Sequence, residues 1–162
     1  MKKCPVISVF IMTVLILTSC SPAHVRKDRP EDDPGRSYTE DKSIESFYYA
    51  HKHAVHRIGA KGPDAFDCSG FTQSLFSEIY GIELPRTSGS QYFSGNRVKN
   101  INELSYGDLV FFNTSGRGVS HVGVYLKNDI FVHASSSLGV TKSNIRDNYW
   151  RKRFLEGRRV LR

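Results

Sequence analysis

Cysteine is scarce in this sequence: the 162 residues contain three, Cys4, Cys20 and Cys68. Only Cys68 lies in the part of the chain that has the composition of a folded domain, which excludes a disulfide-stapled fold. Long apolar segments are also missing. The longest, Val6–Leu17, has 12 mostly apolar residues, too few to cross a bilayer as a helix. The sequence also has no internal repeat.

The short apolar segment has the features of an export signal. Lys2 and Lys3 precede it, and it ends in Leu17–Cys20, with the sequence Leu-Thr-Ser-Cys. A basic start followed by an apolar core is typical of a signal peptide. The final tetrapeptide resembles the processing site of bacterial lipoproteins, which implies cleavage before Cys20 and lipid attachment to it. We therefore predict a signal peptide over residues 1–19; the alternative is an ordinary signal with an incidental cysteine.

Residues 20–42 are rich in charge and proline and poor in apolar side chains. Such a segment cannot bury a core, so we expect a mobile tether between the lipidated cysteine and a domain over residues 43–162. Ser21 follows the cysteine, and by resemblance to Gram-negative lipoproteins this favours the outer membrane. The protein is then expected in the cell envelope, anchored by lipid at the periplasmic face of that membrane.

The chain is basic, with a net charge of +7, or +5 once Lys2 and Lys3 leave with the signal. Nucleic acid is not expected as a partner of an exported protein, so an anionic wall polymer or lipid surface fits the charge better. A merely solvated basic face explains it equally well. The basic residues concentrate near the C-terminus, at Arg151, Lys152, Arg153, Arg158, Arg159 and Arg162.

Cys68 stands where a glycine-rich segment gives way to a helical pattern. Apolar residues from Phe71 to Ile79 recur on one face of a helix, and Gly81 follows as a stop signal, which predicts a helix over Cys68–Tyr80. Amide groups at a helix start stabilise a thiolate, so we expect a lowered thiol pKa and a nucleophilic cysteine. A lone exported thiol is prone to oxidation, which also argues for a chemical role. The alternative is a buried structural cysteine.

Two segments with alternating apolar residues, 121–126 and 130–134, flank the turn residues 127–129 and predict a β-hairpin. Pairing Leu126 with Ile130 collects apolar side chains on one face. The other face then carries His121, Gly123, Tyr125, Phe131 and His133, with His133 opposite Gly123 and diagonal to His121.

This hairpin can supply a base and an orienting group for Cys68. His121 would accept the thiol proton and return it to a leaving amine, and His133 would hold the His121 ring. The alternatives are two ordinary surface histidines, or a zinc ion bound by all three side chains.

The remaining elements are expected from shorter patterns. His53 and His56 lie three residues apart on a predicted helix, but no carboxylate or cysteine joins them at ligand spacing, so no metal site is predicted there. Trp150 is interpreted as a core or groove aromatic. The elements are a helix over 43–58, a short helix capped by Thr87 and ended by Gly95, strands over 108–112 and 140–142, a turn or short helix from 148, and an edge strand over 158–161.

Five ordered blocks resemble the NlpC family of papain-like bacterial cell-wall peptidases. The resemblance covers residues 43–162 and implies an α+β papain-like fold with the cysteine helix packed on an antiparallel sheet. It implies a triad of Cys68, His121 and His133 that cleaves peptidoglycan stem peptides with no metal or organic cofactor. The blocks are Phe66–Phe71, Leu84–Thr87, Gly107–Phe112, His121–Tyr125 and Phe131–Ala134.

The resemblance also assigns residues around the nucleophile. Asp67 and Ser69 flank Cys68 and match positions for substrate binding near the oxyanion, although helix capping explains Asp67 equally well. Arg86 matches a block that lines the groove, or serves turn chemistry. The family usually has a tyrosine twelve residues before the cysteine, where this chain has His56. A histidine can still donate a hydrogen bond to an oxyanion.

The sequence thus predicts a monomeric, lipid-anchored cysteine endopeptidase of the bacterial wall. One rival is an amide or acyl transferase on the same scaffold, in which an amine rather than water resolves the acyl-enzyme. The other is a catalytically weak or inactive wall-binding lipoprotein, for which the replacement at His56 is the main support.

Overall fold

A computed structural model describes residues 43–161 of the chain. The predicted signal peptide (1–19), the lipidation of Cys20 and the tether (20–42) lie outside the described residues. No helix within the described part is both long and apolar enough to span a membrane.

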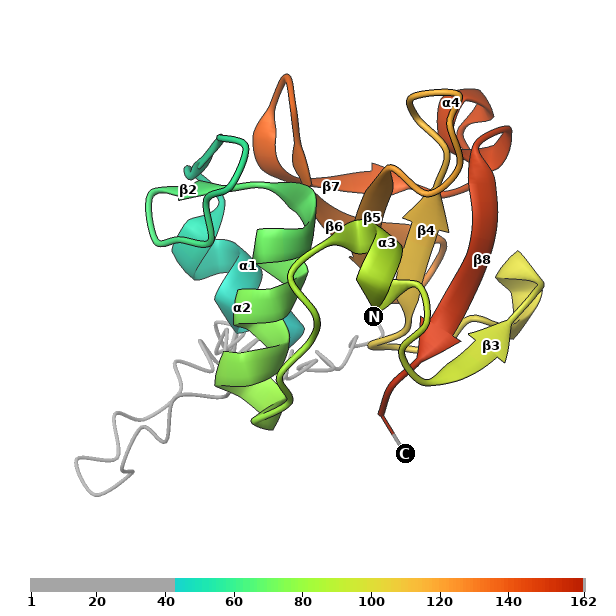
Figure 1. Ribbon diagram of the computed structural model, residues 1–162, viewed down its shortest axis with the longest axis horizontal. Coiled ribbons are helices and arrows are strands. Elements are labelled where there is room, and N and C mark those ends of the chain that lie inside the picture. Colours follow the sequence, from blue (N-terminus) through green and yellow to red (C-terminus); the bar gives the residue numbers. More distant parts are fainter. Residues whose placement is uncertain (1–42, 162) are drawn as a thin grey trace, which may run out of the picture. The chain divides into compact units, whose positions relative to one another are not determined.

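A six-stranded antiparallel sheet forms the centre of the domain (Figure 1). The predicted hairpin is confirmed, because Val124 pairs with Val132 and Tyr125 with Phe131. In spatial order the strands are β3 (Asn96–Val98), β8 (Phe154–Arg159), β4 (Leu109–Phe112), β5 (His121–Tyr125), β6 (Ile130–Ser135) and β7 (Gly139–Asn144).

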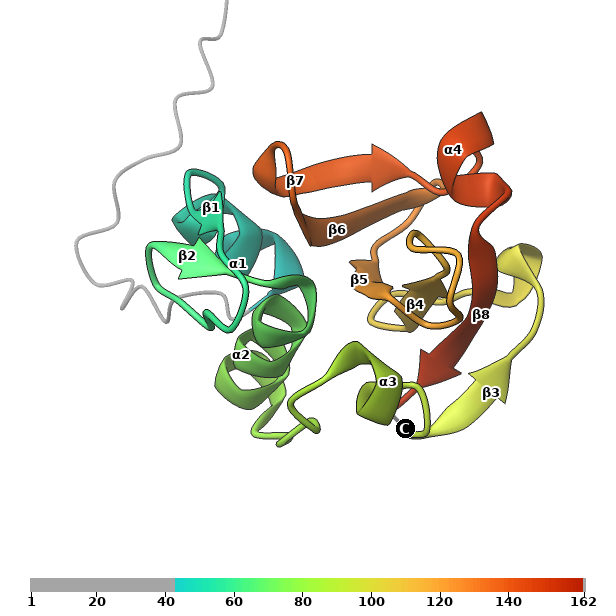
Figure 2. The ribbon, with the colours of Figure 1, turned by 45° about the horizontal axis from the view of Figure 1, so that its top comes forward.

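The predicted cysteine helix is confirmed as α2 (Cys68–Tyr80), which ends at Gly81 in the left-handed conformation. Its apolar face, with Phe71, Leu75 and Phe76, packs in one core cluster with residues such as Val122 on the sheet. Two further elements lie on the same side of the sheet as α2 in both ribbon views (Figures 1 and 2). They are helix α1 (Ile44–His51) and the small parallel pair of strands β1 (Val55–His56) and β2 (Ala65–Phe66). The predicted α+β architecture is therefore confirmed.

The opposite face of the sheet has its own smaller core. Phe112, Phe131 and Ile145 are buried there, with Trp150 packed against them. Trp150 belongs to the short helix α4 (Asn148–Arg151). The other short helices are α3 (Ser88–Gln91), which Thr87 caps as predicted but which ends before Gly95, and η1 (Ile101–Glu103).

Two further sequence predictions about elements are wrong. The helix expected over 43–58 ends at His51, because the chain turns there to place Val55 and His56 beside β2. Val55 is 55% exposed and belongs to no apolar helix face. The C-terminal strand is not an edge strand, since β3 pairs with its outer side. Strand β3 contains a single apolar residue, Val98, so its sequence alone does not predict a strand.

Candidate active site

Cys68 is the first residue of α2, and Asp67 is its N-cap. The Asp67 carboxylate accepts hydrogen bonds from the backbone N–H of Gly70 (2.6 Å) and of Gly59 (2.8 Å), so it ties the helix start to the preceding loop. The partly buried thiol lies beside β5, where the backbone N–H of Val122 faces the sulfur. Because Val122 follows His121, the helix start and the first histidine meet at the beginning of β5.

Burial raises the pKa of the Cys68 thiol, and the neighbouring Asp67 carboxylate raises it further. The N–H groups of Val122, Ser69 and Cys68 itself act in the opposite direction but do not compensate. The expectation of a lowered thiol pKa is therefore wrong. The helix-start amides are present as predicted, but desolvation of the charged form outweighs them.

His121 and His133 form the predicted pair. His121 Nε2 lies 2.9 Å from His133 Nδ1, and His133 Nε2 lies 3.0 Å from Ser143 Oγ. Position 123 has no room for a side chain: a Cβ there would stand 2.7 Å from the Phe131 ring and from the Val132 carbonyl oxygen, and 3.1 Å from His133 Cβ. The two rings bond each other rather than point to one common centre, which is the geometry of a base and its orienting group.

Aromatic side chains enclose the histidine pair. The Trp150 ring centroid lies 4.9 Å from that of His133 and 5.4 Å from that of His121, and Phe131 stacks on His133 at 4.9 Å. Trp150 is thus a groove aromatic packed on the pair. His133 is only 1% exposed, so its ring nitrogens depend on protein partners for hydrogen bonds.

Burial keeps both imidazoles neutral. It lowers the pKa of His121 to about 4, with a smaller electrostatic contribution from His56. Burial and the charge of His121 lower the pKa of His133 well below its ordinary value. Near pH 7 the Cys68 thiol and the His121 imidazole are therefore both neutral. Since His133 occupies Nε2 of His121, Nδ1 is the nitrogen left for the thiol.

Arg86 forms a polar cluster with Asp67 and Ser69, the two residues that flank Cys68. Its guanidinium donates to both oxygens of Asp67 (2.7 and 3.0 Å) and to Ser69 Oγ (3.2 Å). Although burial acts to raise the pKa of Asp67, the hydrogen bonds from Arg86, Gly70 and Gly59 hold it below its usual value. The structure thus brings together the predicted residues around the nucleophile. Asp67 also acts as the helix cap that the sequence allowed.

A cleft of about 250 Å³ opens beside the imidazole pair. It places His121 and His133 at the wall of a space large enough for a small part of a peptide. Hydroxyl and aromatic groups form the remaining wall, namely Thr114, Ser135, Ser136, Ser137, Ser143, Tyr149 and Trp150, together with Leu138.

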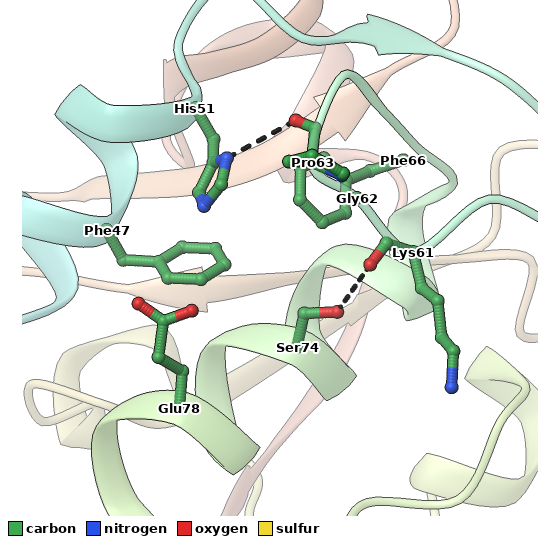
Figure 3. A pocket seen from close by; sticks show the side chains of 8 residues that line it. All are labelled: Phe47, His51, Lys61, Gly62, Pro63, Phe66, Ser74 and Glu78. Atoms are coloured by element: carbon green, nitrogen blue, oxygen red, sulfur yellow. Dashed lines mark hydrogen bonds between the residues drawn. The ribbon is translucent and has the colours of Figure 1, made fainter.

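A second cavity of about 310 Å³ lies between α1, α2 and the loop before β2 (Figure 3). Phe47, His51 and Phe66 line it, and none of the catalytic candidates does. His51 Nδ1 bonds the Pro63 carbonyl oxygen at 3.3 Å. Among residues 43–161, no three His, Cys, Asp or Glu side chains converge as metal ligands would.

Two of the C-terminal basic residues have structural partners. Arg159 forms a double hydrogen bond with Asp108 (2.8 and 2.9 Å), and Arg158 pairs with Glu156. Asp108 and Glu156 are each 1% exposed, so their charges need these partners. These two arginines are therefore paired with buried carboxylates of the domain itself.

Residues 53–159 match the NlpC/P60 family. The chain is 40% identical over 121 residues to a Haemophilus influenzae protein named "Probable endopeptidase NlpC homolog", covering 75% of this chain and 63% of that protein. It is 46% identical over 106 residues to an Escherichia coli protein named murein DD-endopeptidase MepS and murein LD-carboxypeptidase, covering 65% and 55%. The chain thus spans between about half and two thirds of the length of these relatives.

The fold matches a crystal structure as well. A Staphylococcus aureus protein described as similar to lipoprotein, NLP/P60 family, superposes with a TM-score of 0.65 at 30% identity. The match covers 75% of this chain and 41% of that one. The α+β fold is therefore shared with a solved relative.

Proposed function

The chain belongs to the NlpC/P60 family, and we propose that it is a cysteine endopeptidase that hydrolyses amide bonds in peptidoglycan stem peptides or cross-links. The observation that carries this proposal is the 2.9 Å hydrogen bond between His121 and His133, at the start of the strand that meets the Cys68 thiol. A cysteine nucleophile needs such an oriented base. The substrate class follows from the similarity to MepS, which is named for murein.

In the proposed reaction, the Cys68 sulfur attacks the amide carbonyl carbon while His121 Nδ1 takes the thiol proton. Because the thiol and the imidazole are both neutral at rest, His121 has to take the proton for the sulfur to act as the nucleophilic thiolate. His121 then gives the proton to the amine as the C–N bond breaks, which leaves a thioester on Cys68. Water attacks this thioester, again with His121 as base, and releases the carboxylic acid and the thiol.

His56 and Arg86 are proposed to contact the substrate. His56 contributes electrostatically to the lowered pKa of His121, which supports a position at the site where the His56 imidazole could donate to the developing oxyanion. Arg86 is held by Asp67 and Ser69 and could offer its remaining N–H groups to the acyl portion of the substrate.

We expect His56→Phe to lower kcat by about 10-fold or more and His56→Tyr to restore it, whereas Arg86→Gln should mainly raise KM. Steady-state kinetics on a murein fragment separates these roles.

We also propose that the protein acts as a monomer that a lipid on Cys20 anchors to the outer membrane, facing the wall. The Leu-Thr-Ser-Cys segment supports lipidation, and the S. aureus structure is described as similar to lipoprotein. Labelled palmitate should enter the wild-type protein in cells and fail to enter Cys20→Ser. Equal labelling of the two would contradict the anchor.

Digestion of purified peptidoglycan by the full chain tests the reaction class. We expect products whose masses correspond to addition of one water across an amide bond, and the masses identify the bond. An added amine should leave the products unchanged. Products that carry the amine in place of water would indicate a transferase, and intact peptidoglycan would contradict both.

A further inference from the structure

We infer that Ser143 is a positioning residue that keeps His133, and through it His121, in the tautomer that proton abstraction from Cys68 requires. This inference rests on the proposed peptidase function. Ser143 lies on β7, where it pairs with Phe131 in a register that runs without a break from Ile130–Asn144 to Ser135–Gly139. Its Oγ is 3.0 Å from His133 Nε2.

The chain of hydrogen bonds is productive in one direction only. To accept the thiol proton at Nδ1, a neutral His121 must carry its own hydrogen on Nε2. That hydrogen is donated to His133 Nδ1 across 2.9 Å, so His133 must carry its hydrogen on Nε2. The acceptor for this last hydrogen is Ser143 Oγ. In the opposite direction His121 would present an N–H to the thiol and could not act as a base.

Ser143 can favour the productive direction because of where the two residues lie. His133 is 1% exposed, so an Nε2–H without an acceptor would be a buried, unpaired donor, which is costly. Ser143 lines the cleft, so its own hydrogen can be given to water or substrate there while a lone pair faces His133. Without the hydroxyl, His133 would move its hydrogen to Nδ1 and force His121 into the unproductive tautomer.

Threonine and valine at position 143 provide a matched test, since the two side chains have nearly the same shape and both favour strands. We expect Ser143→Val to lower kcat by about 10- to 100-fold with little change in KM. Ser143→Thr should keep kcat within about threefold, because it restores the acceptor. In the free protein, ¹⁵N chemical shifts of the imidazoles should show the hydrogen of His121 on Nε2 in the wild type and in Ser143→Thr, and on Nδ1 in Ser143→Val.

The outcomes separate this inference from the proposed function. If the wild type cleaves peptidoglycan but Ser143→Val and Ser143→Thr have equal kcat and equal tautomers, Ser143 has no positioning role. If the wild type does not cleave, the peptidase proposal fails, while the imidazole shifts still decide whether Ser143 sets the tautomer. If Ser143→Val does not fold, Ser143→Ala replaces it in both measurements, with the same expected results.

Discussion

Replacing His121 with alanine should lower kcat for peptidoglycan cleavage by about 10²- to 10⁴-fold, the range usually supplied by a general base. The effect should lie toward the upper end because burial raises the pKa of Cys68. Without a base, only a small fraction of the thiol is ionised at neutral pH. The measurement is kcat at pH 7 on a defined murein fragment.

The exposed His53 offers a matched control, since His53→Ala removes an imidazole outside the pair. Its kcat should equal that of the wild type. His133 provides a second comparison. The Asn carbonyl oxygen in His133→Asn can accept from His121 Nε2–H, so we expect it to retain more activity than His133→Ala. Wild-type kcat in His121→Ala would contradict the assignment of the base.

The acid limb of kcat/KM should have its midpoint near pH 4 rather than near the ordinary histidine value of 6.5. Burial lowers the pKa of His121 to about 4, and the base works only when it is neutral. Activity should therefore persist through pH 5 and fall as the pH drops through 4. A midpoint at pH 6.5 would show that the His121 imidazole is not desolvated in solution.

The lowered pKa of His121 also makes the free energy of unfolding depend on pH. The folded pKa of His121 is lower than the unfolded one, so the unfolded chain binds the proton first as the pH falls. The contribution of neutral His121 to the free energy of unfolding is complete above pH 6.5, and it is lost progressively as the pH falls to about 4. A difference of this size is worth about 3 kcal/mol. Urea unfolding at pH 7 and pH 4.5 should show less loss in His121→Asn than in the wild type or in His53→Gln.

Periodic patterns in the sequence predicted the centre of the site. The repeat from Phe71 to Ile79 defined α2 with Cys68 at its start, and alternation in the hairpin fixed the register that joins His121 and His133. Both predictions rest on side chains that are close together in the sequence. In the hairpin, a shift of the register by one residue would bury polar groups.

Features that depend on tertiary packing were not accessible in this way. The direction of the Cys68 pKa shift depends on how deeply the thiol is buried, and a helix-start argument contains no such information. Ser143 became recognisable only once β7 paired with β6 over its full length, beyond the predicted residues 140–142. Likewise, the pairing of Arg158 with the buried Glu156 follows from the interior position of β8 in the sheet.

The most direct test of Cys68 as the nucleophile is the rate of peptidoglycan digestion by the wild type and by Cys68→Ala, with products read by mass spectrometry. Ser74→Ala serves as the control on the same helix, because Ser74 bonds the Lys61 carbonyl at the second cavity (Figure 3). We predict that the wild type and Ser74→Ala open the same peptide bonds and that a folded Cys68→Ala opens none. Cleavage by Cys68→Ala at a rate near that of the wild type would contradict the account, since another group would then be the nucleophile.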